Sequence, residues 1–188
     1  MPEITATQAM PVVIVLAAGR GERFLASGGA THKLQALLAG KPVIDHVLDA
    51  VRASGLPFHV VTAHPSRPGM GDSIAAGVLA TAGATGWLML PADLPLVQPS
   101  TLRCIAFAPP SIVTVPSYFG QQGHPVRFGS ACAKNLLNLQ GNQGAARVIS
   151  ELKAINSVAI INVDDPGCVT DIDTLADLQR VEALLAER

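Results

Sequence analysis

The first strong signal in the chain is a run of six apolar residues, Pro11 to Leu16, followed at once by a loop rich in glycine. An uninterrupted apolar run is typical of a strand that is buried on both faces of a parallel sheet. The loop, residues 17–30, leads to a segment that starts near Val43, has apolar residues at helical spacing and is ended by Gly55. A chain that begins in this way is expected to pack helices against a parallel sheet.

The same alternation of short β-branched runs and longer helical segments continues along the chain. Further strands are expected at residues 58–62, 86–90, 112–116 and 158–163, a hairpin or loop at 118–128, and helices at 74–79, from 98, at 134–140, 146–152 and 175–185. This order predicts a single-domain α/β fold, Rossmann-like and doubly wound, with a mostly parallel sheet. Residues 1–10 are expected to form an N-terminal tail and residues 11–188 the domain. Ligands of such sheets bind beyond the carboxyl ends of the strands, here after Leu16 and at Asp93.

Composition excludes several classes of function. Of the 188 residues, 49% are hydrophobic and 14% charged, and the net charge is −1. A nearly neutral chain does not attract a polyanion, so nucleic acid is not an expected partner. No apolar stretch reaches about 18 residues and no signal peptide is evident, so we expect a cytoplasmic protein without a membrane span. Cys104, Cys132 and Cys168 are far apart and odd in number, which predicts free thiols.

The loop after the first strand carries the groups that a triphosphate needs. Its glycines allow a close backbone approach, its amides can surround an anion, and three cations, Arg20, Arg23 and Lys33, lie in or beyond it. A dinucleotide fingerprint fits less well, because Phe24 stands where the third glycine belongs and no acid ends the next strand. A P-loop would require Gly-Lys-Ser/Thr, which is absent here. A plain surface loop with scattered charges is the remaining alternative.

Two groups of acids are candidates for holding a metal ion. Asp93 lies between two prolines directly after an apolar strand, although a lone aspartate in a turn is often only a turn residue. Asp171 and Asp173 are two residues apart, which puts them on one face of an extended segment. Acids at a helix N-terminus, which the helix dipole favours, are the structural alternative for this second group. Magnesium in proteins takes one or two carboxylates together with phosphate oxygens and water.

These motifs together resemble those of the MobA-like nucleotidyltransferases, most closely the molybdenum cofactor cytidylyltransferases, over residues 11–185. The resemblance implies catalytic roles for Arg23, Lys33 and Asp93, with Arg23 and Lys33 on the triphosphate. It implies Mg²⁺ as cofactor, held by Asp93 and Asp173 with Asp171 next, while Asp177 is assigned to structure. The nucleotide-binding set that it implies is Leu16, Ala17, Ala18, Gly19, Arg20, Gly21, Lys33, Ser73 and Gly77.

Other segments match the family pattern less closely. Ser73 lies at a helix start that contacts base or ribose in the family, although an N-cap role explains it equally well. His124, in a Gly-His-Pro segment, and Arg147 are implied to bind the acceptor; a turn residue and an exposed helix residue are the alternatives. The chain departs from the family pattern at three places: Asp72, Asn142 and an insertion, Leu25 to His32.

The activity that the resemblance implies is transfer of a nucleotide from an NTP·Mg²⁺ complex to a phosphorylated acceptor, with release of pyrophosphate. The loop sequence Ala17-Ala18-Gly19 resembles that of family members that use CTP, whereas Ala-Gly-Gly is typical of those that use GTP, so the resemblance implies CTP over GTP. The physical sense is that the methyl group of Ala18 narrows the base pocket toward a pyrimidine. The implied acceptor is molybdopterin, with a sugar phosphate or polyol phosphate as alternatives. A non-catalytic nucleotide-binding protein that loads cofactor into a molybdoenzyme partner is the alternative from another class, and an NAD(P) dehydrogenase is a third.

Overall fold

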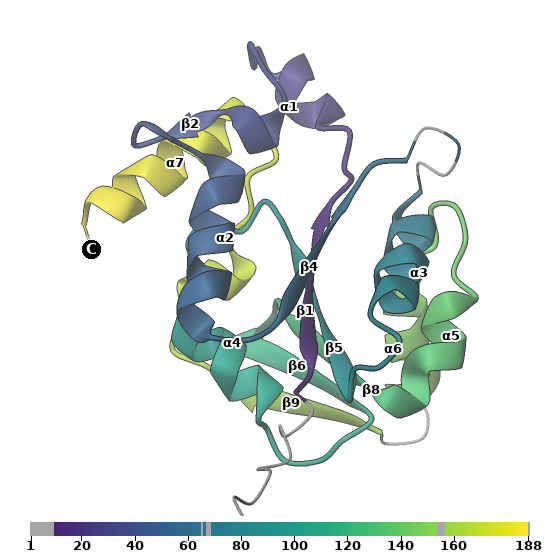
Figure 1. Ribbon diagram of the computed structural model, residues 1–188. Helices are drawn as coiled ribbons and strands as arrows, with labels where there is room; N and C mark the ends of the chain where they lie inside the picture. The colour runs from purple at the N-terminus through teal and green to yellow at the C-terminus, as the bar shows by residue number, and fades with distance from the viewer. Residues whose placement is uncertain (1–9, 65, 67–68, 154–156, 188) are drawn as a thin grey trace, which may run out of the picture.

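The computed structural model describes residues 10–64, 66, 69–153 and 157–187 (Figure 1). The helices and strands are β1 (Val12–Ala17), α1 (Glu22–Ala26), β2 (Leu37–Leu38), β3 (Lys41–Pro42), α2 (Val43–Ser54), β4 (Phe58–Thr62), α3 (Met70–Ala80), β5 (Gly86–Pro91), α4 (Pro99–Ala106), β6 (Val113–Tyr118), β7 (Gln121–Gln122), β8 (Val126–Gly129), α5 (Ala133–Leu137), α6 (Ala146–Lys153), β9 (Val158–Asn162) and α7 (Leu175–Ala186). Three short 3₁₀ turns, η1 (Lys33–Gln35), η2 (Ser130–Cys132) and η3 (Pro166–Val169), join them. Apart from Met10, the expected N-terminal tail lies outside the described residues.

The central sheet has seven strands in the order β4-β1-β5-β8-β6-β7, with β9 paired to β6. Strand β1 pairs in parallel with β4 and β5, and β6 pairs in parallel with β9. Strand β8 lies antiparallel between β5 and β6. The predicted α/β class with a mostly parallel sheet is confirmed, and β8 begins within residues 118–128, where a hairpin or loop is expected from the sequence.

Helices cover both faces of the sheet, and each face has its own hydrophobic core. Figure 1 shows α2, α4 and α7 on one side of the strands and α3, α5 and α6 on the other. Strand β1 contributes to both cores, because successive side chains of a strand point to opposite faces. Val13 and Val15 pack with α2 and α4, Ile14 packs with α3, and all three are fully buried. This burial explains why the first strand contains no polar residue.

Two helices differ from the sequence-based expectation. Helix α1 lies inside the segment expected to be a loop. Helix α3 begins at Met70, with Gly69 as its N-cap, rather than at Asp72 or Ser73. The earlier start depends on a long-range contact, because the Gly71 amide donates to the Gly141 carbonyl at 2.8 Å. A Cβ at Gly69 or Gly71 would overlap the backbone of residues 140–143, so only glycine allows these two segments to meet.

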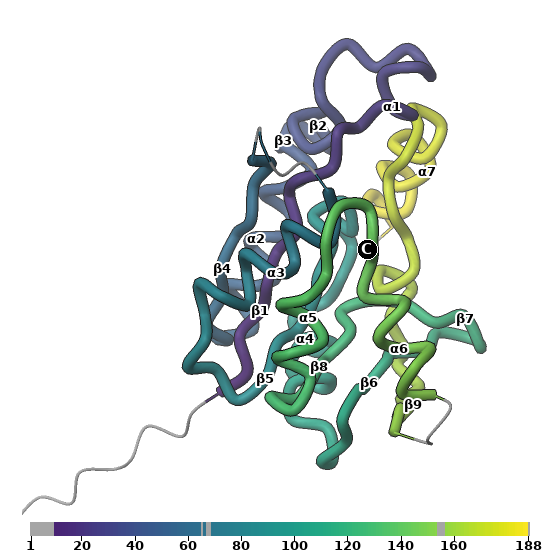
Figure 2. The backbone as a smooth tube through the Cα atoms, turned by 90° about the vertical axis from the view of Figure 1, so that its right-hand side faces the viewer, coloured from purple at the N-terminus to yellow at the C-terminus, as the bar shows by residue number. Residues whose placement is uncertain are grey.

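The thiols and the helix lengths agree with the sequence analysis. Cys104 is exposed, Cys132 and Cys168 are buried, and none of the three is in a disulfide. Within the described residues, every helix is too short or too polar to cross a bilayer. The tube in Figure 2 shows the loop around α1 at one end of the molecule, beside the N-terminal part of α7.

Candidate active site

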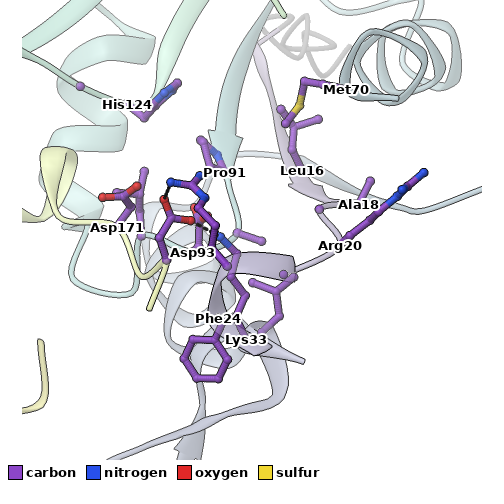
Figure 3. Close-up of a pocket in the computed structure, with 18 of the residues that line it drawn as sticks. Leu16, Ala18, Arg20, Phe24, Lys33, Met70, Pro91, Asp93, His124 and Asp171 are labelled. Atoms are coloured by element: carbon purple, nitrogen blue, oxygen red, sulfur yellow. Dashed lines mark hydrogen bonds and ion pairs between the residues drawn. The ribbon is translucent and has the colours of Figure 1, made fainter. Parts of the chain in front are cut away.

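A cavity of about 720 Å³ lies beyond the carboxyl ends of β1 and β5. Its wall has two ends, which we name by the segments that form them. The loop end consists of Leu16 and residues 18–24, together with Met70 and Asn142; the hairpin end consists of residues 121–124 with Cys168, Val169 and Asp171. In the view of Figure 3, Met70, Leu16 and Ala18 lie to one side and His124 and Asp171 to the other.

Four charged side chains form an ion-pair cluster between these ends: Arg23, Lys33, Asp93 and Asp173. Lys33 Nζ donates to Asp93 Oδ2 at 2.6 Å and to Asp173 Oδ1 at 2.8 Å. The second oxygen of Asp173, Oδ2, lies 2.7 Å from Arg23 Nη1. The cluster therefore joins the loop after β1 to the turn after β5 and to the segment before α7.

A backbone hydrogen bond brings the two acidic segments together. Asp93 lies two residues after the end of β5, and its carbonyl accepts from the Ile172 amide at 3.0 Å. The chain on either side of Ile172 is held next to the turn, so Asp173 reaches the same ammonium as Asp93. Thr174 and Asp177 then form the capping box that starts α7, which agrees with the structural role expected for Asp177.

The ion-pair cluster keeps Lys33 charged. Burial by itself lowers the pKa of Lys33, but the charges and hydrogen bonds of Asp93 and Asp173 outweigh it and raise the pKa above 10.5. Lys33 is only 9% exposed, whereas the side chain of Arg23 is 76% exposed. The two cationic side chains therefore differ in how freely they can move. Lys33 is buried in the wall of the cavity, and Arg23 extends into the cavity from its rim.

The inserted segment, Leu25 to His32, folds back onto the loop end. Phe24 is 1% exposed and packs closely against Gly29, where a Cβ would lie 2.3 Å from the ring. His32 Nδ1 accepts from the Leu34 amide at 3.3 Å, which leaves Nε2 as the protonated nitrogen that donates to the Gly19 carbonyl at 2.7 Å. The insertion thus fixes the loop and returns the chain so that Lys33 enters the cavity.

The hairpin end is neutral or acidic. The His124 amide donates to the Cys168 carbonyl at 2.8 Å, and a Cβ at Gly123 would lie 2.3 Å from that oxygen. Burial lowers the pKa of His124 from 6.5, so the ring is neutral at pH 7, and Nδ1 donates to the Met89 carbonyl at 3.3 Å. Burial raises the pKa of Asp171 from 3.8. Within the described residues, this end has no lysine or arginine in its wall.

The carboxylates of the cluster fit a divalent cation in type and position. Oxygens of Asp93 and Asp173 already converge on one cationic group, the ammonium of Lys33. In the part of the chain that the structure describes, no group of three or more His, Cys, Asp or Glu side chains is arranged to hold a metal ion. A magnesium ion at this place would therefore need oxygens from a bound phosphate or from water, as is usual for this ion.

Four of the implied binding residues do not line the cavity. Ser73 Oγ is buried and donates to the Gly69 carbonyl at 3.0 Å inside the first turn of α3. A Cβ at Gly77 would lie 2.7 Å from Ile14, so this glycine lets α3 pack on β1. Arg147 is exposed and pairs with Glu151 at 3.0 Å on α6. Ala17 ends β1 and packs against the core. For these residues packing or helix contacts, not a ligand, explain the residue type.

Other lining residues were missed by the sequence reasoning, and Met70 and Asn142 are the clearest. Both are placed by Asp72, whose Oδ2 accepts from the Gly69 amide at 3.3 Å and from the Gly141 amide at 3.1 Å. The unusual acid at 72 therefore connects the start of α3 to the loop that carries Asn142. Gln121, Gln122 and Val169 also line the cavity without any motif that marks them.

Fold and cavity together define the class: an α/β protein of the nucleotide-diphospho-sugar transferase type, with a charged cavity at the carboxyl edge of its sheet. The comparisons give the family. The model of the MobA-like NTP transferase domain matches residues 13–155, and the chain belongs to this family.

Individual proteins are similar to this chain in sequence or in fold. The purine catabolism protein PucB of Bacillus subtilis is 26% identical over 161 residues, which cover 76% of this chain and 78% of that protein. The crystal structure of Rv0371c from Mycobacterium tuberculosis superposes with a TM-score of 0.74 at 25% identity, covering 93% of this chain and 98% of that one. A nucleotidyl transferase from Methanothermobacter thermautotrophicus gives a TM-score of 0.80 at 22% identity, with 95% and 98% covered, which shows a common fold.

Proposed function

We propose that this protein transfers a nucleoside monophosphate from an NTP to a phosphorylated small molecule and releases pyrophosphate. One observation carries the proposal: carboxylates that are 80 residues apart, Asp93 and Asp173, converge on a single cationic group beside an amide-rich turn. A polyphosphate with a divalent cation needs both of these features, an anion-binding backbone and oxygen ligands for the cation. Family membership supports the reaction class.

In the proposed reaction, an oxygen of the acceptor phosphate attacks the α-phosphorus of the NTP. A new P–O bond forms there as the bond to the β-phosphate oxygen breaks, and the electron pair leaves with pyrophosphate. The nucleophile is already an anion, so the protein has no need of a strong base. Positioning and neutralisation of charge are the main tasks, since two anions must approach each other. Arg23 and Lys33 are proposed to hold the departing phosphates.

The loop end is proposed to bind the nucleotide. Leu16 and Ala18 offer apolar contacts for a base, and the amides from Gly19 to Gly21 offer donors for phosphate oxygens. Gly21 has a φ of 64°, which favours glycine and turns the chain into α1. Arg20 lies at the rim, paired with Glu22 at 3.4 Å.

Asp93 and Asp173 are proposed to hold Mg²⁺, and Asp171 is the next candidate ligand. When bound, the ion would neutralise charge on the phosphates as it builds up. Asp171 makes no hydrogen bond or ion pair with Lys33 among the described contacts, and its raised pKa reflects burial next to the other two carboxyls. The Mycobacterium tuberculosis relative has also been crystallised in a complex with manganese, which supports a divalent ion in this family.

We propose CTP as the preferred nucleotide and a molybdopterin-type phosphate as the acceptor, bound at the hairpin end beside His124. A structure of the same fold, CMP:2-keto-3-deoxy-manno-octonic acid synthetase, was determined with CTP, and another neighbour is a molybdopterin-guanine dinucleotide biosynthesis protein A from Archaeoglobus fulgidus. These two relatives are 17% and 18% identical and share the fold alone. GTP, and a sugar or polyol phosphate, are the alternatives. The free thiols fit a reducing cytoplasm.

The second candidate is a nucleotide-binding accessory protein without turnover that serves a molybdoenzyme. The name of the Bacillus subtilis relative refers to purine catabolism and to no transferase, which favours keeping this candidate. Both candidates place the nucleotide at the loop end, in one domain over residues 11–188, so binding alone does not separate them.

Pyrophosphate release separates the two candidates. The assay supplies CTP, GTP, ATP or UTP with Mg²⁺ and a molybdopterin, sugar phosphate or polyol phosphate acceptor. The transferase proposal predicts acceptor-dependent pyrophosphate with CTP fastest. Tight CTP binding without pyrophosphate for any acceptor would favour the accessory protein.

A further inference from the structure

Lys33 occupies the space that a divalent ion would need between the two carboxylates. Its Nζ lies 2.6 Å from Asp93 and 2.8 Å from Asp173, and its side chain is 11% exposed. Arg23 takes the second oxygen of Asp173. Two cations and two carboxylates thus compensate each other within the cluster, without any other ion.

We infer that Lys33 is a positioning residue that keeps divalent-metal affinity low in the nucleotide-free protein and releases the carboxylates when a polyphosphate binds. The inference rests on the proposed function and concerns the order of events at the same site. It predicts that metal and nucleotide enter together, because each removes an obstacle to the other.

The energetic reason is the charge of Lys33. A metal ion that enters the nucleotide-free site must either share the carboxylates with an ammonium of like charge or displace that ammonium from them. A displaced and poorly solvated charge without a partner is costly. A polyphosphate offers Lys33 a new anionic partner inside the same cavity, so displacement no longer leaves the ammonium unpaired.

The local structure allows Lys33 to move while its backbone stays in place. The backbone around Lys33 is fixed, because the Gln35 amide donates to the His32 carbonyl at 2.8 Å and His32 is itself bonded to Gly19. The side chain is a flexible four-carbon stem with a single compact charge. A rotation of that stem moves Nζ between the carboxylates and the cavity. Arg23 is mostly exposed and leaves Asp173 at little cost, so Lys33 dominates the barrier to the metal.

Titration of the full chain with Mn²⁺ without nucleotide, followed by electron paramagnetic resonance, tests this inference. Lys33→Met keeps the apolar stem and removes the charge, so it should bind Mn²⁺ about 10-fold or more tightly than the wild type, within the usual range of coupling between sites. Lys33→Arg keeps the charge and should stay as weak as the wild type. Lys41→Met removes a lysine that pairs with Asp49 outside the cavity and is the matched control.

Equal or weaker Mn²⁺ binding by Lys33→Met would overturn the inference, and circular dichroism verifies that the variant is folded. If Lys33→Met does not fold, a measurement on the wild-type protein still tests the inference. Crystals soaked in MnCl₂ alone should show no anomalous peak between Asp93 and Asp173, and Lys33 should still bond to both carboxylates. Crystals with Mn²⁺ and a non-hydrolysable CTP analogue should show the peak, and the Lys33 ammonium should bond to a phosphate group of the analogue.

A strong manganese peak between the carboxylates without nucleotide would contradict the inference and leave the transferase proposal standing. The two failures are distinguishable, because the proposed function fails instead if calorimetry detects no binding of any NTP, with or without Mg²⁺.

Discussion

The loop end and the hairpin end of the cavity are built in opposite ways. The loop end comes mainly from one stretch of chain, residues 16–24, and carries Arg20 and Arg23. The hairpin end joins residues 121–124 to residues 168–171 through the bond from the His124 amide to Cys168, and its described wall has no lysine or arginine. This difference supports the proposal that the polyphosphate binds at the loop end. The acceptor phosphate is proposed to reach the central cluster, with the uncharged part of the acceptor at the hairpin end.

The largest effect is expected from the cluster that lies between the ends. Asp93→Ala should fold normally but lose turnover by about 10²–10³, the loss typical when one group that stabilises transition-state charge is removed. Steady-state pyrophosphate release measures it. Asp49→Ala, which removes a surface aspartate paired with Lys41 and Arg52, is the control and should keep normal rates. Near-normal turnover of Asp93→Ala would remove Asp93 from the mechanism.

The next effect concerns Lys33, the cluster lysine that is proposed to hold the polyphosphate bound at the loop end. Lys33→Ala should weaken NTP binding at saturating Mg²⁺ by about 10-fold to 100-fold, because it removes a hydrogen bond to a charged group worth about 1.5–3 kcal/mol. Calorimetry measures the dissociation constant, and Lys41→Ala should leave it unchanged. If Lys33→Ala changed only the KM for the acceptor, the assignment of the two ends would be reversed.

A smaller effect is expected at the hairpin end. His124→Gln should raise the KM for the acceptor by about threefold to tenfold, the effect of one neutral hydrogen bond, and leave the KM for the NTP unchanged. Initial-rate kinetics with each substrate varied in turn measure both constants. Arg147→Ala is the control, since Arg147 lies on the exposed side of α6 with Glu151 and should change neither. A rise in the KM for the NTP in His124→Gln would contradict the assignment of the hairpin end to the acceptor.

The smallest effect concerns stability and pH. Burial lowers the pKa of His124 in the folded protein, while the unfolded chain has the ordinary value of 6.5. Below pH 6.5 the unfolded chain therefore binds a proton that the folded protein resists, and the free energy of unfolding should fall as the pH falls from 7 toward 5. Urea unfolding of the wild type and His124→Gln should show a shallower decline for the variant. Parallel declines would show that His124 titrates normally.

Much of the fold could be predicted because its signals are local. The apolar run of β1 and the glycine that ends α2 each act through neighbouring residues, and both segments form where the pattern placed them. Helix α3 could not be placed correctly, because its start depends on Gly69 and Gly71 meeting residues 140–143. Strand β8 was expected only as part of a hairpin or loop for the same reason, since its four residues pair with β5 and β6 only in the folded sheet.

In the candidate site, too, local motifs could be predicted from the sequence, whereas long-range contacts could not. Sequence motifs indicate Lys33, Asp93 and Asp173 as candidates. Only the fold brings the two carboxylates, which are 60 and 140 residues from Lys33 in the sequence, to its ammonium. The binding roles predicted for Gly77 and Ser73 stay predictions, because other contacts also explain these residue types. Gly77 allows α3 to pack on β1, and Ser73 bonds to the Gly69 carbonyl within α3. Met70 matches no motif, and the sequence marks Asn142 and Asp72 only as departures from the family pattern. The structure shows that Asp72 positions both Met70 and Asn142.

The most direct test of the account is a calorimetric titration of the wild-type protein with each NTP, with and without Mg²⁺. The account predicts that CTP binds at one site, more tightly than GTP, and that Mg²⁺ strengthens the binding. Failure of every NTP to bind under both conditions, or binding that Mg²⁺ leaves unchanged, would contradict a polyphosphate held between Arg23, Lys33 and the two carboxylates.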